Sequence, residues 1–271
     1  MANTVAVYNF KGGVGKTTTS LNLGFSWSKS FKVLLMDFDH QCNLTNSLSI
    51  ESHSTTIYGY VRSILHDHPV EIAPVEVTPY LHLIPGDYSM VNAESNNQFI
   101  SFGSTIIQKL LWAVKKDYDF IIMDCPTNFG ILVKSILSAS KSILIPAVAD
   151  TFSITGVQKL LTHLASVDNT YSLNVLGVFF NMYNGHLIRS REKYQEAKKA
   201  FGDLILSKTI SRSIRVGEAT DIGKSINEYD PENTVAKEFM SLSDELLSKF
   251  DSQYLKSDYI LPDLLEKVRI G

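Results

Sequence analysis

A glycine-rich stretch near the start of the chain, residues 11–18, carries the residue types that bind phosphate. It reads Lys-Gly-Gly-Val-Gly-Lys-Thr-Thr and lies between an apolar run, residues 5–7, and a segment whose apolar residues have helical spacing, residues 21–27. Glycines let successive backbone N–H groups turn toward one anion, and the N-terminus of a following helix adds its own N–H groups. Lys16 can then reach the terminal phosphates, and the Thr17 hydroxyl can hold Mg²⁺. The pattern predicts a nucleoside triphosphate site.

The loop departs from the ordinary phosphate-loop pattern at its first position. The pattern G-x-x-x-x-G-K-[ST] requires its first glycine at position 10, where this chain has Phe10 followed by Lys11. A lysine this early in the loop does not fold back easily onto its own nucleotide. We therefore expect the Lys11 side chain to reach outward.

Two further apolar runs end in an acidic residue, Asp37 and Asp124. Parallel sheets gather binding groups at the carboxyl ends of their strands, so both acids are expected at the same edge as the phosphate loop. A buried strand that ends in aspartate is the Walker B arrangement, which delivers a carboxylate to the water shell of the metal. Asp39 follows two residues after Asp37. It is a candidate for the site, and a helix cap ahead of Leu44 is the alternative interpretation.

Strand and helix patterns alternate over nearly the whole chain, which is typical of a doubly wound α/β fold. We expect a mostly parallel sheet with helices on both faces, in one domain over residues 1–250. The tail, residues 251–271, has apolar residues at helical spacing. We expect it to form a helix that packs on the domain or on a dimer mate.

The amino-acid composition limits the class of protein to which this chain can belong. The 271 residues are 44% hydrophobic, which suffices for the core of one large domain, and no run approaches 18 consecutive apolar residues. Two cysteines without a C-x-x-C pair favour neither a disulfide framework nor a metal cluster. The first strand pattern begins within four residues of Met1, so we expect no signal peptide and a cytoplasmic protein.

One segment, residues 189–224, is more basic than the rest. It holds nine Lys or Arg and five Asp or Glu, an excess of four positive charges in a chain whose net charge is −3. Clustered Lys and Arg bind the phosphate backbone of DNA without reading its bases. A DNA-binding patch is one interpretation, and a solvated helix face with polar loops is the other. The candidate DNA-binding residues are Arg189, Lys198, Lys199, Arg212, Arg215 and Lys224.

These motifs together resemble the ParA family within the ParA/MinD superfamily of dimerising ATPases, whose phosphate loop is a deviant Walker A box. Residues 37–45 resemble its switch I, usually D-x-D-P-Q-G-N-L-T, and residues 124–130 its switch II, usually D-x-P-P-x-x-G. Residues 210–219 resemble its run I-P-R-x-V-R-x-x-E-A. The likeness covers roughly residues 3–250. The departures from the family pattern are His40, Cys42, Thr127, Asn128 and Ser211.

The resemblance implies ATP and Mg²⁺ as cofactors and assigns residues to them. Lys11 would act in trans, on the ATP of a second subunit. The implied catalytic residues are Lys11, Lys16, Asp39 and Asp124, where Asp39 orients the attacking water or contacts the Mg²⁺ shell. The implied metal site is Thr17, Asp39 and Asp124. The implied nucleotide contacts are Lys11, Gly12, Gly13, Val14, Gly15, Lys16, Thr17 and Thr18, with Asn181, Ile210 and Ser211 near the adenine.

The family further implies a slow, partner-stimulated ATPase that forms an ATP-dependent homodimer and binds DNA non-specifically. Such a protein associates with the nucleoid when ATP-bound and positions a plasmid, a chromosome region or a protein assembly. A ParB-like or other adaptor would trigger release, and residues 87–97 are a candidate interface segment. The alternative is a MinD-like membrane-associated regulator of cell division. The charge balance of the tail argues against stable membrane binding. An electron donor or cluster carrier would need more cysteines, and Lys11 disfavours a small-molecule kinase.

Overall fold

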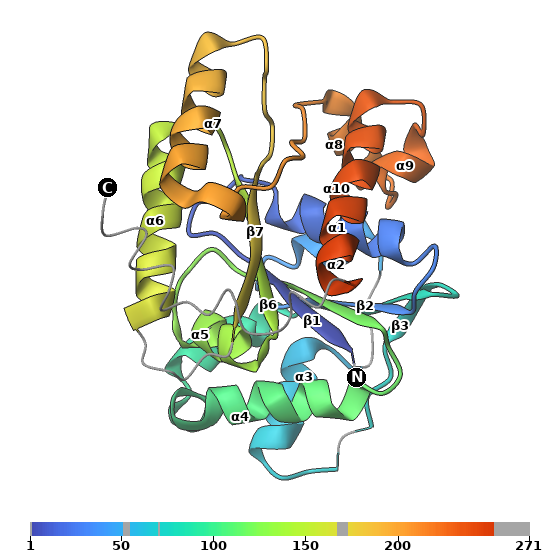
Figure 1. Ribbon diagram of the computed structural model, residues 1–271. Helices are drawn as coiled ribbons and strands as arrows, with labels where there is room; N and C mark the ends of the chain where they lie inside the picture. Colours follow the sequence, from blue (N-terminus) through green and yellow to red (C-terminus); the bar gives the residue numbers. More distant parts are fainter. Residues whose placement is uncertain (1, 51–54, 70, 167–172, 252–271) are drawn as a thin grey trace.

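A single seven-stranded sheet runs through the computed structural model, which describes residues 2–50, 55–69, 71–166 and 173–251 (Figure 1). The strand order is β3-β4-β2-β5-β1-β6-β7, and every neighbouring pair is parallel except β3 with β4. The strands are β1 (Asn3–Val7), β2 (Val33–Asp37), β3 (Val75–Thr78), β4 (Leu81–Ile84), β5 (Phe120–Asp124), β6 (Ser142–Ala147) and β7 (Asn174–Phe180). The predicted mostly parallel sheet is confirmed.

The register of the central strands brings their carboxyl ends to one edge. Val7 of β1 lies opposite Asp124 of β5, and Asp37 of β2 lies opposite Asp124 as well. These strands are buried on both faces, which explains why their sequences are continuously apolar rather than alternating. The two acids therefore reach the same edge of the sheet, as their position after apolar runs predicts.

Helices cover both faces, and each face has its own core (Figure 1). One core packs the first group of helices, which are α1 (Lys16–Trp27), α2 (Asn43–Ser47), α8 (Ile214–Asp221), α9 (Ile226–Tyr229) and α10 (Thr234–Asp251). The other core packs the second group, which are α3 (Ile57–Leu65), α4 (Asn97–Val114), α5 (Ile131–Ala139), α6 (Thr151–Ser166) and α7 (Ile188–Phe201). Two short 3₁₀ helices are η1 (Tyr88–Ser95) and η2 (Gly202–Leu204). The doubly wound architecture is confirmed.

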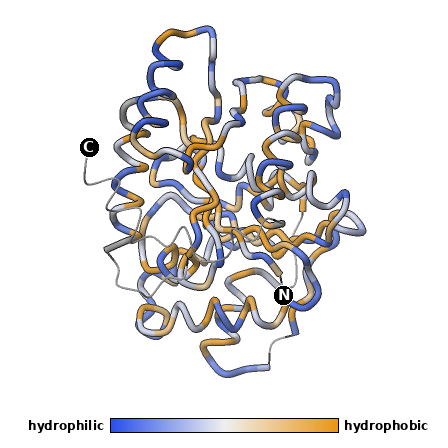
Figure 2. Tube along the Cα trace, in the orientation of Figure 1, coloured by the Kyte–Doolittle hydropathy of each residue, from blue (hydrophilic) through white to orange (hydrophobic). Residues whose placement is uncertain are grey.

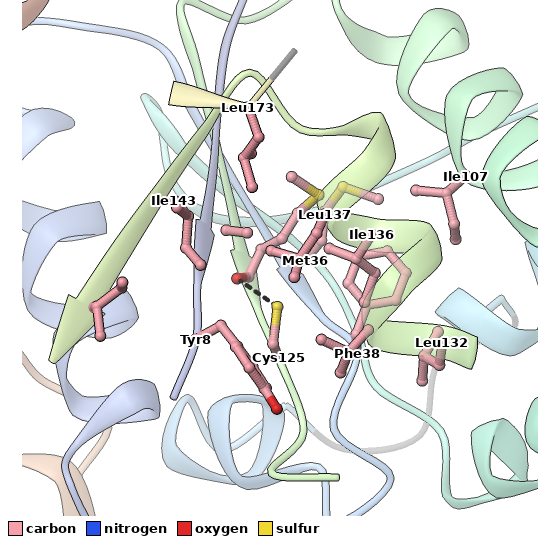
Figure 3. Packing of buried hydrophobic residues seen from close by; sticks show 14 of the residues in the cluster. Tyr8, Met36, Phe38, Ile107, Cys125, Leu132, Ile136, Leu137, Ile143 and Leu173 are labelled. Atoms are coloured by element: carbon pink, nitrogen blue, oxygen red, sulfur yellow. Dashed lines mark hydrogen bonds between the residues drawn. The ribbon is translucent and has the colours of Figure 1, made fainter. Parts of the chain in front are cut away.

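The apolar residues concentrate on the central strands, where Figure 2 shows the trace most continuously orange. Figure 3 shows the core beneath the carboxyl end of β5, with Tyr8 beside Cys125. The Cys125 thiol is buried and donates to the carbonyl of Met123 at 3.6 Å. Burial raises the pKa of this thiol well above its usual range. Cys125 is therefore a packed core residue and not a reactive one.

Strand β3 leaves only a weak signal in the sequence. It pairs antiparallel with β4 at the edge of the sheet, and its side chains are only half-buried or exposed. Strand β4, in contrast, has the alternating apolar residues Leu81 and Leu83, which favour a strand. An edge strand of four residues has too little buried surface to leave a clear apolar signal.

The domain boundary proposed at residue 250 stays a prediction. Helix α10 ends at Asp251, and the tail beyond it, residues 252–271, lies outside the described residues. Within the part of the chain that the structure describes, no helix has the length and apolar content needed to cross a bilayer.

Replacing Gly24 of α1 by alanine is expected to lower the free energy of unfolding by about 1–3 kcal/mol, because α1 packs too closely on β2 for a methyl group. A Cβ atom at this position would lie 2.9 Å from Cδ2 of Leu35, which is fully buried. Urea unfolding measures the change. Gly217→Ala in α8 is the control, since a Cβ there meets nothing within 4 Å. Alanine should stabilise that helix by about 1 kcal/mol. Stabilisation by both changes would contradict the close α1–β2 packing.

Candidate active site

The glycine-rich loop joins β1 to α1 and borders a cavity of about 560 Å³. Gly13 (φ 71°) and Gly15 (φ 89°) have left-handed backbones, which glycine adopts without steric cost. Asn9 fixes the start of the loop, because its side chain accepts from the Lys11 N–H and donates to the carbonyl of Pro146 at 2.7 Å. The loop therefore has the curled backbone that its glycine spacing predicts.

The walls of the cavity come from four parts of the chain. The loop and the start of α1 supply one side, including Lys16 and Thr17. The other walls are Asp39 with α2, Thr127 after β5, and the end of α8. The predicted switch segments therefore border the same space as the loop.

Lys16 is the cation of the cavity, and its side chain is largely buried. Its ammonium donates to the Lys11 carbonyl at 3.4 Å and to the Thr127 hydroxyl at 3.2 Å. Burial lowers the pKa of Lys16, while the nearby Asp124 carboxylate acts in the opposite direction. A half-desolvated ammonium held over a curled loop is suited to bind the oxygens of a terminal phosphate.

Asp124 is fully buried at the end of β5 and is held by two hydroxyl groups. Thr17 Oγ1 donates to it at 2.7 Å and Ser20 Oγ at 3.1 Å. Burial, and then the neighbouring Asp37, raise the pKa of Asp124 to about 8. A buried carboxylate next to a threonine hydroxyl is a donor set that fits Mg²⁺. Mg²⁺ keeps several of its waters when it binds protein, so one or two protein oxygens can suffice to hold it.

Asp37 anchors switch I instead of facing the cavity. Its buried carboxylate accepts from the backbone N–H of Thr45 at 2.9 Å, from the Thr45 hydroxyl at 2.7 Å and from the N–H of Asp39 at 3.2 Å. The Thr45 N–H belongs to the first turn of α2, so Asp37 caps this helix. Burial raises the pKa of Asp37 to about 6.

Asp39 lines the cavity, and its carboxylate accepts from the Gln41 N–H at 3.0 Å. The capping role considered for Asp39 is therefore wrong, because Asp37 fills it. His40 lies at the turn, with Nδ1 3.5 Å from Asp39. Cys42 has a left-handed backbone (φ 54°), which fits the glycine that the ParA pattern places there.

Lys11 leaves its own cavity, as the departure from the ordinary loop pattern predicts. Its ammonium pairs with Asp150 Oδ2 at 2.5 Å, just before α6, and both side chains are about one-third exposed. Asp150 follows β6, so its position repeats that of the other acids at strand ends. The pair holds Lys11 beside the cavity rather than in it.

The three residues predicted to lie near adenine gather at the carboxyl end of β7. Asn181 is buried, and its side-chain amide donates to the Val14 carbonyl at 2.8 Å, so it clamps the phosphate loop. Ile210 is buried and bonded to the backbone of Phe180, while Ser211 donates through N–H and hydroxyl to Glu238. These contacts place the residues together, and their adenine role stays a prediction.

The predicted basic patch divides into two groups on opposite faces of the sheet. Helix α7 packs into one core and α8 into the other. Arg212 and Lys224, which flank α8, are exposed. Arg215 is exposed too, and it pairs with Glu218 at 2.9 Å. The DNA-binding role of residues 189–224 stays a prediction.

The α7 group contains the other three candidates. Arg189 and Lys199 are exposed at its two ends. Lys198 is only half exposed, because its ammonium donates to the Ile205 carbonyl at 3.1 Å. Lys198 is therefore a poorer candidate for a phosphate contact than its neighbours.

Sequence reasoning missed Ser20 and the role of Thr127, which touch Asp124 and Lys16. Ser20 follows Lys16 by four residues on one helix, so helical spacing could have indicated it. Thr127 was noted only as a departure from the ParA switch II pattern. Only the fold shows that its hydroxyl reaches the Lys16 ammonium.

Known proteins resemble the chain along almost its entire length. A family model described as an AAA domain matches residues 2–176. Sporulation initiation inhibitor protein Soj of Bacillus subtilis (strain 168) is 33% identical over 251 residues, which cover 91% of this chain and 98% of Soj.

Solved structures share the fold. A variant of McdA from Cyanothece in complex with ATP has a TM-score of 0.77 at 25% identity, covering 91% of this chain and 96% of that one. The septum site-determining protein MinD from Pyrococcus horikoshii OT3, complexed with Mg-ADP, has a TM-score of 0.73 at 23% identity. That match covers 93% of this chain and all of MinD.

The metal-free protein is expected to lose stability as the pH rises from 5 to 8, because burial keeps the Asp124 carboxyl protonated in the folded state while it ionises freely in the unfolded state. Its pKa is about 8 in the folded protein. The unfolded value is about 3.9. Between these values the folded state binds more protons than the unfolded state, so the free energy of unfolding falls as pH rises.

Thermal unfolding in EDTA at pH 5 and 8 measures this loss, and Asp124→Asn should reduce it. Asp67→Asn, at a side chain 92% exposed, is the control. A pH dependence that Asp124→Asn leaves intact would show that another group causes it.

Proposed function

The chain belongs to the ParA family of partition ATPases, and on that premise we propose that ATP closes two copies into a sandwich dimer that binds DNA and positions a cargo. The protein is an ATPase, with ATP as its substrate and Mg²⁺ as the metal that its donor set fits. The cargo is a plasmid, a chromosome region or a protein assembly. Release follows when an adaptor stimulates hydrolysis.

The observation that carries the dimer proposal is the direction of Lys11. This lysine belongs to the phosphate loop, yet its ammonium lies on Asp150, outside the cavity that Lys16 occupies. Lys16 and the loop N–H groups supply what one nucleotide needs within its own subunit. A second loop lysine that faces outward is suited to reach the nucleotide of a neighbouring copy.

Within each subunit, the described residues take separate roles. Thr17 and Asp124 hold Mg²⁺ through a hydroxyl oxygen and a carboxylate at the end of β5, and Lys16 binds the terminal phosphates. Asp39 faces the cavity from switch I and orients the attacking water. Hydrolysis would be slow until a partner acts, as the resemblance to the family implies.

The DNA proposal rests on the exposed cations of the α8 group, Arg212, Arg215 and Lys224. The end of α8, at Thr220 and Asp221, borders the nucleotide cavity. A shift of α8 when the cavity closes around a nucleotide would therefore also move these exposed cations. DNA binding would be independent of sequence, because arginine and lysine contacts with the phosphate backbone do not recognise the bases. The ATP-bound protein would then associate with the nucleoid.

The MinD-like alternative shares the fold and the loop. It requires a basic amphipathic tail, and the residues in question lie outside the described part of the chain. The near-neutral charge of that tail disfavours its binding to an anionic membrane surface. A ParB-like or other adaptor, with η1 as a candidate contact, therefore remains our proposed partner.

Lys11→Ala is expected to leave ATP binding by the monomer intact and to abolish the ATP-dependent dimer, because the crossing contact is lost. Light scattering with a non-hydrolysable ATP analogue measures the dimer, and nucleotide titration measures binding. Asp150→Ala is the control, because it removes the cis contact but keeps the lysine. A Lys11→Ala protein that still forms the ATP-dependent dimer would contradict the in-trans role of Lys11.

Arg212→Glu is expected to weaken DNA binding of the ATP-bound protein by about tenfold at moderate salt, because it reverses one phosphate contact. Fluorescence anisotropy with random-sequence DNA over a salt series measures affinity and slope. Lys109→Glu, the same charge change at an exposed lysine of α4, is the control. Equal effects of the two changes would assign DNA binding to overall charge and not to the α8 group.

A further inference from the structure

Thr127 lies at the point where switch II meets the catalytic lysine. It follows β5 by three residues and lines the nucleotide cavity. Its hydroxyl oxygen accepts a hydrogen bond from the Lys16 ammonium at 3.2 Å. The second proline of the switch II pattern would stand here, and proline has no hydroxyl. This chain therefore has a polar contact between the phosphate loop and switch II that depends on its own side chain.

The backbone of Thr127 is fixed from the opposite side. The Tyr8 hydroxyl donates to the Thr127 carbonyl at 3.2 Å. Tyr8 is fully buried at the end of β1, beside Cys125 in Figure 3. Its ring also packs against Phe129 and Phe10, with centroids 5.7 and 5.6 Å away. The aromatic contacts hold switch II to the loop, so the Thr127 hydroxyl is presented to the cavity from a supported position.

The hydrogen-bond chemistry of Lys16 makes this contact exchangeable. An ammonium has three protons to donate, and Lys16 uses the Lys11 carbonyl and the Thr127 hydroxyl as acceptors. Phosphate oxygens are stronger acceptors than a neutral hydroxyl, because the hydrogen bond is then charge-assisted at both ends. A terminal phosphate therefore competes for the proton that Thr127 accepts.

A threonine hydroxyl also carries one proton that it can donate while its oxygen changes partner. We propose that Thr127 reads the terminal phosphate of ATP by exchanging its contact with Lys16 for a hydrogen bond donated to a phosphate oxygen. ADP lacks that phosphate and leaves the hydroxyl without this acceptor. Thr127 thus makes switch II, through Phe129 and Tyr8, sensitive to which nucleotide is bound.

This inference rests on the assignment of the cavity as the ATP site, and nucleotide affinity tests it without turnover. Dissociation constants for a non-hydrolysable ATP analogue and for ADP, both with Mg²⁺, are measured by titration with fluorescently labelled nucleotides. Thr127→Val keeps the shape and removes the hydroxyl. It should weaken binding of the analogue by about tenfold, as expected for one hydrogen bond to a charged group. ADP affinity should be unchanged or slightly higher, because Lys16 loses a competing partner.

Thr127→Ser restores the hydroxyl and should return the analogue-to-ADP affinity ratio to that of the parent. Thr105→Val, on the exposed surface of α4, is the matched control and should not change the ratio. Thr127→Ala takes the place of the valine variant if thermal unfolding shows that valine disturbs the fold.

An unchanged ratio in the valine variant, with a parent that binds both nucleotides, overturns the inference and leaves the ATP site in place. Equal weakening of both nucleotides also overturns it, because Thr127 would then only support the loop. A parent that binds neither nucleotide overturns the site itself. A loss confined to the analogue, rescued by serine, supports phosphate reading by Thr127.

Discussion

The buried Asp124 carboxylate, held by the hydroxyls of Thr17 and Ser20, is the contact on which the rest of the site depends. A carboxylate without solvent is stable only where hydrogen bonds or a cation compensate for the lost water. Both hydroxyls come from α1, so the contact also fixes how this helix leaves the phosphate loop. The strand order makes it possible, because β5 lies between β1 and β2 and presents its last residue to the loop.

Side chains from the strand ends fasten each loop around the cavity. Asn181 after β7 holds the phosphate loop through the Val14 carbonyl, Asp37 of β2 holds switch I through Thr45, and Tyr8 after β1 holds switch II. Buried hydrogen bonds of this kind contribute about 1 kcal/mol each, so they position a loop without making it immovable. The sheet is thus the frame to which all three loops are fastened.

Much of this arrangement could be predicted from the sequence, and the reasons differ by residue. Lys16, Thr17 and Asp124 follow from local patterns, because strand–loop–helix order and the parallel-sheet rule fix where they meet. Asp37 and Asp39 are two residues apart, and the sequence pattern does not decide which one caps α2. The Lys16–Thr127 contact joins residues 111 positions apart, and hydroxyl residues are too common to predict such a pair. The basic segment is one block in the sequence, but its two helices, α7 and α8, pack into different cores, which the charge pattern does not indicate.

The Lys11–Asp150 pair has a consequence for how the protein responds to its own abundance. An ion pair this exposed contributes at most about 1 kcal/mol, so the lysine exchanges readily between partners. Asp150 is part of the same chain, and its effective concentration is the same in a dilute and a crowded cell. An acceptor on another copy becomes available in proportion to the number of copies. In the proposed dimer, the internal and external partners of Lys11 would therefore compete, and a higher cellular concentration of the protein would favour the external one.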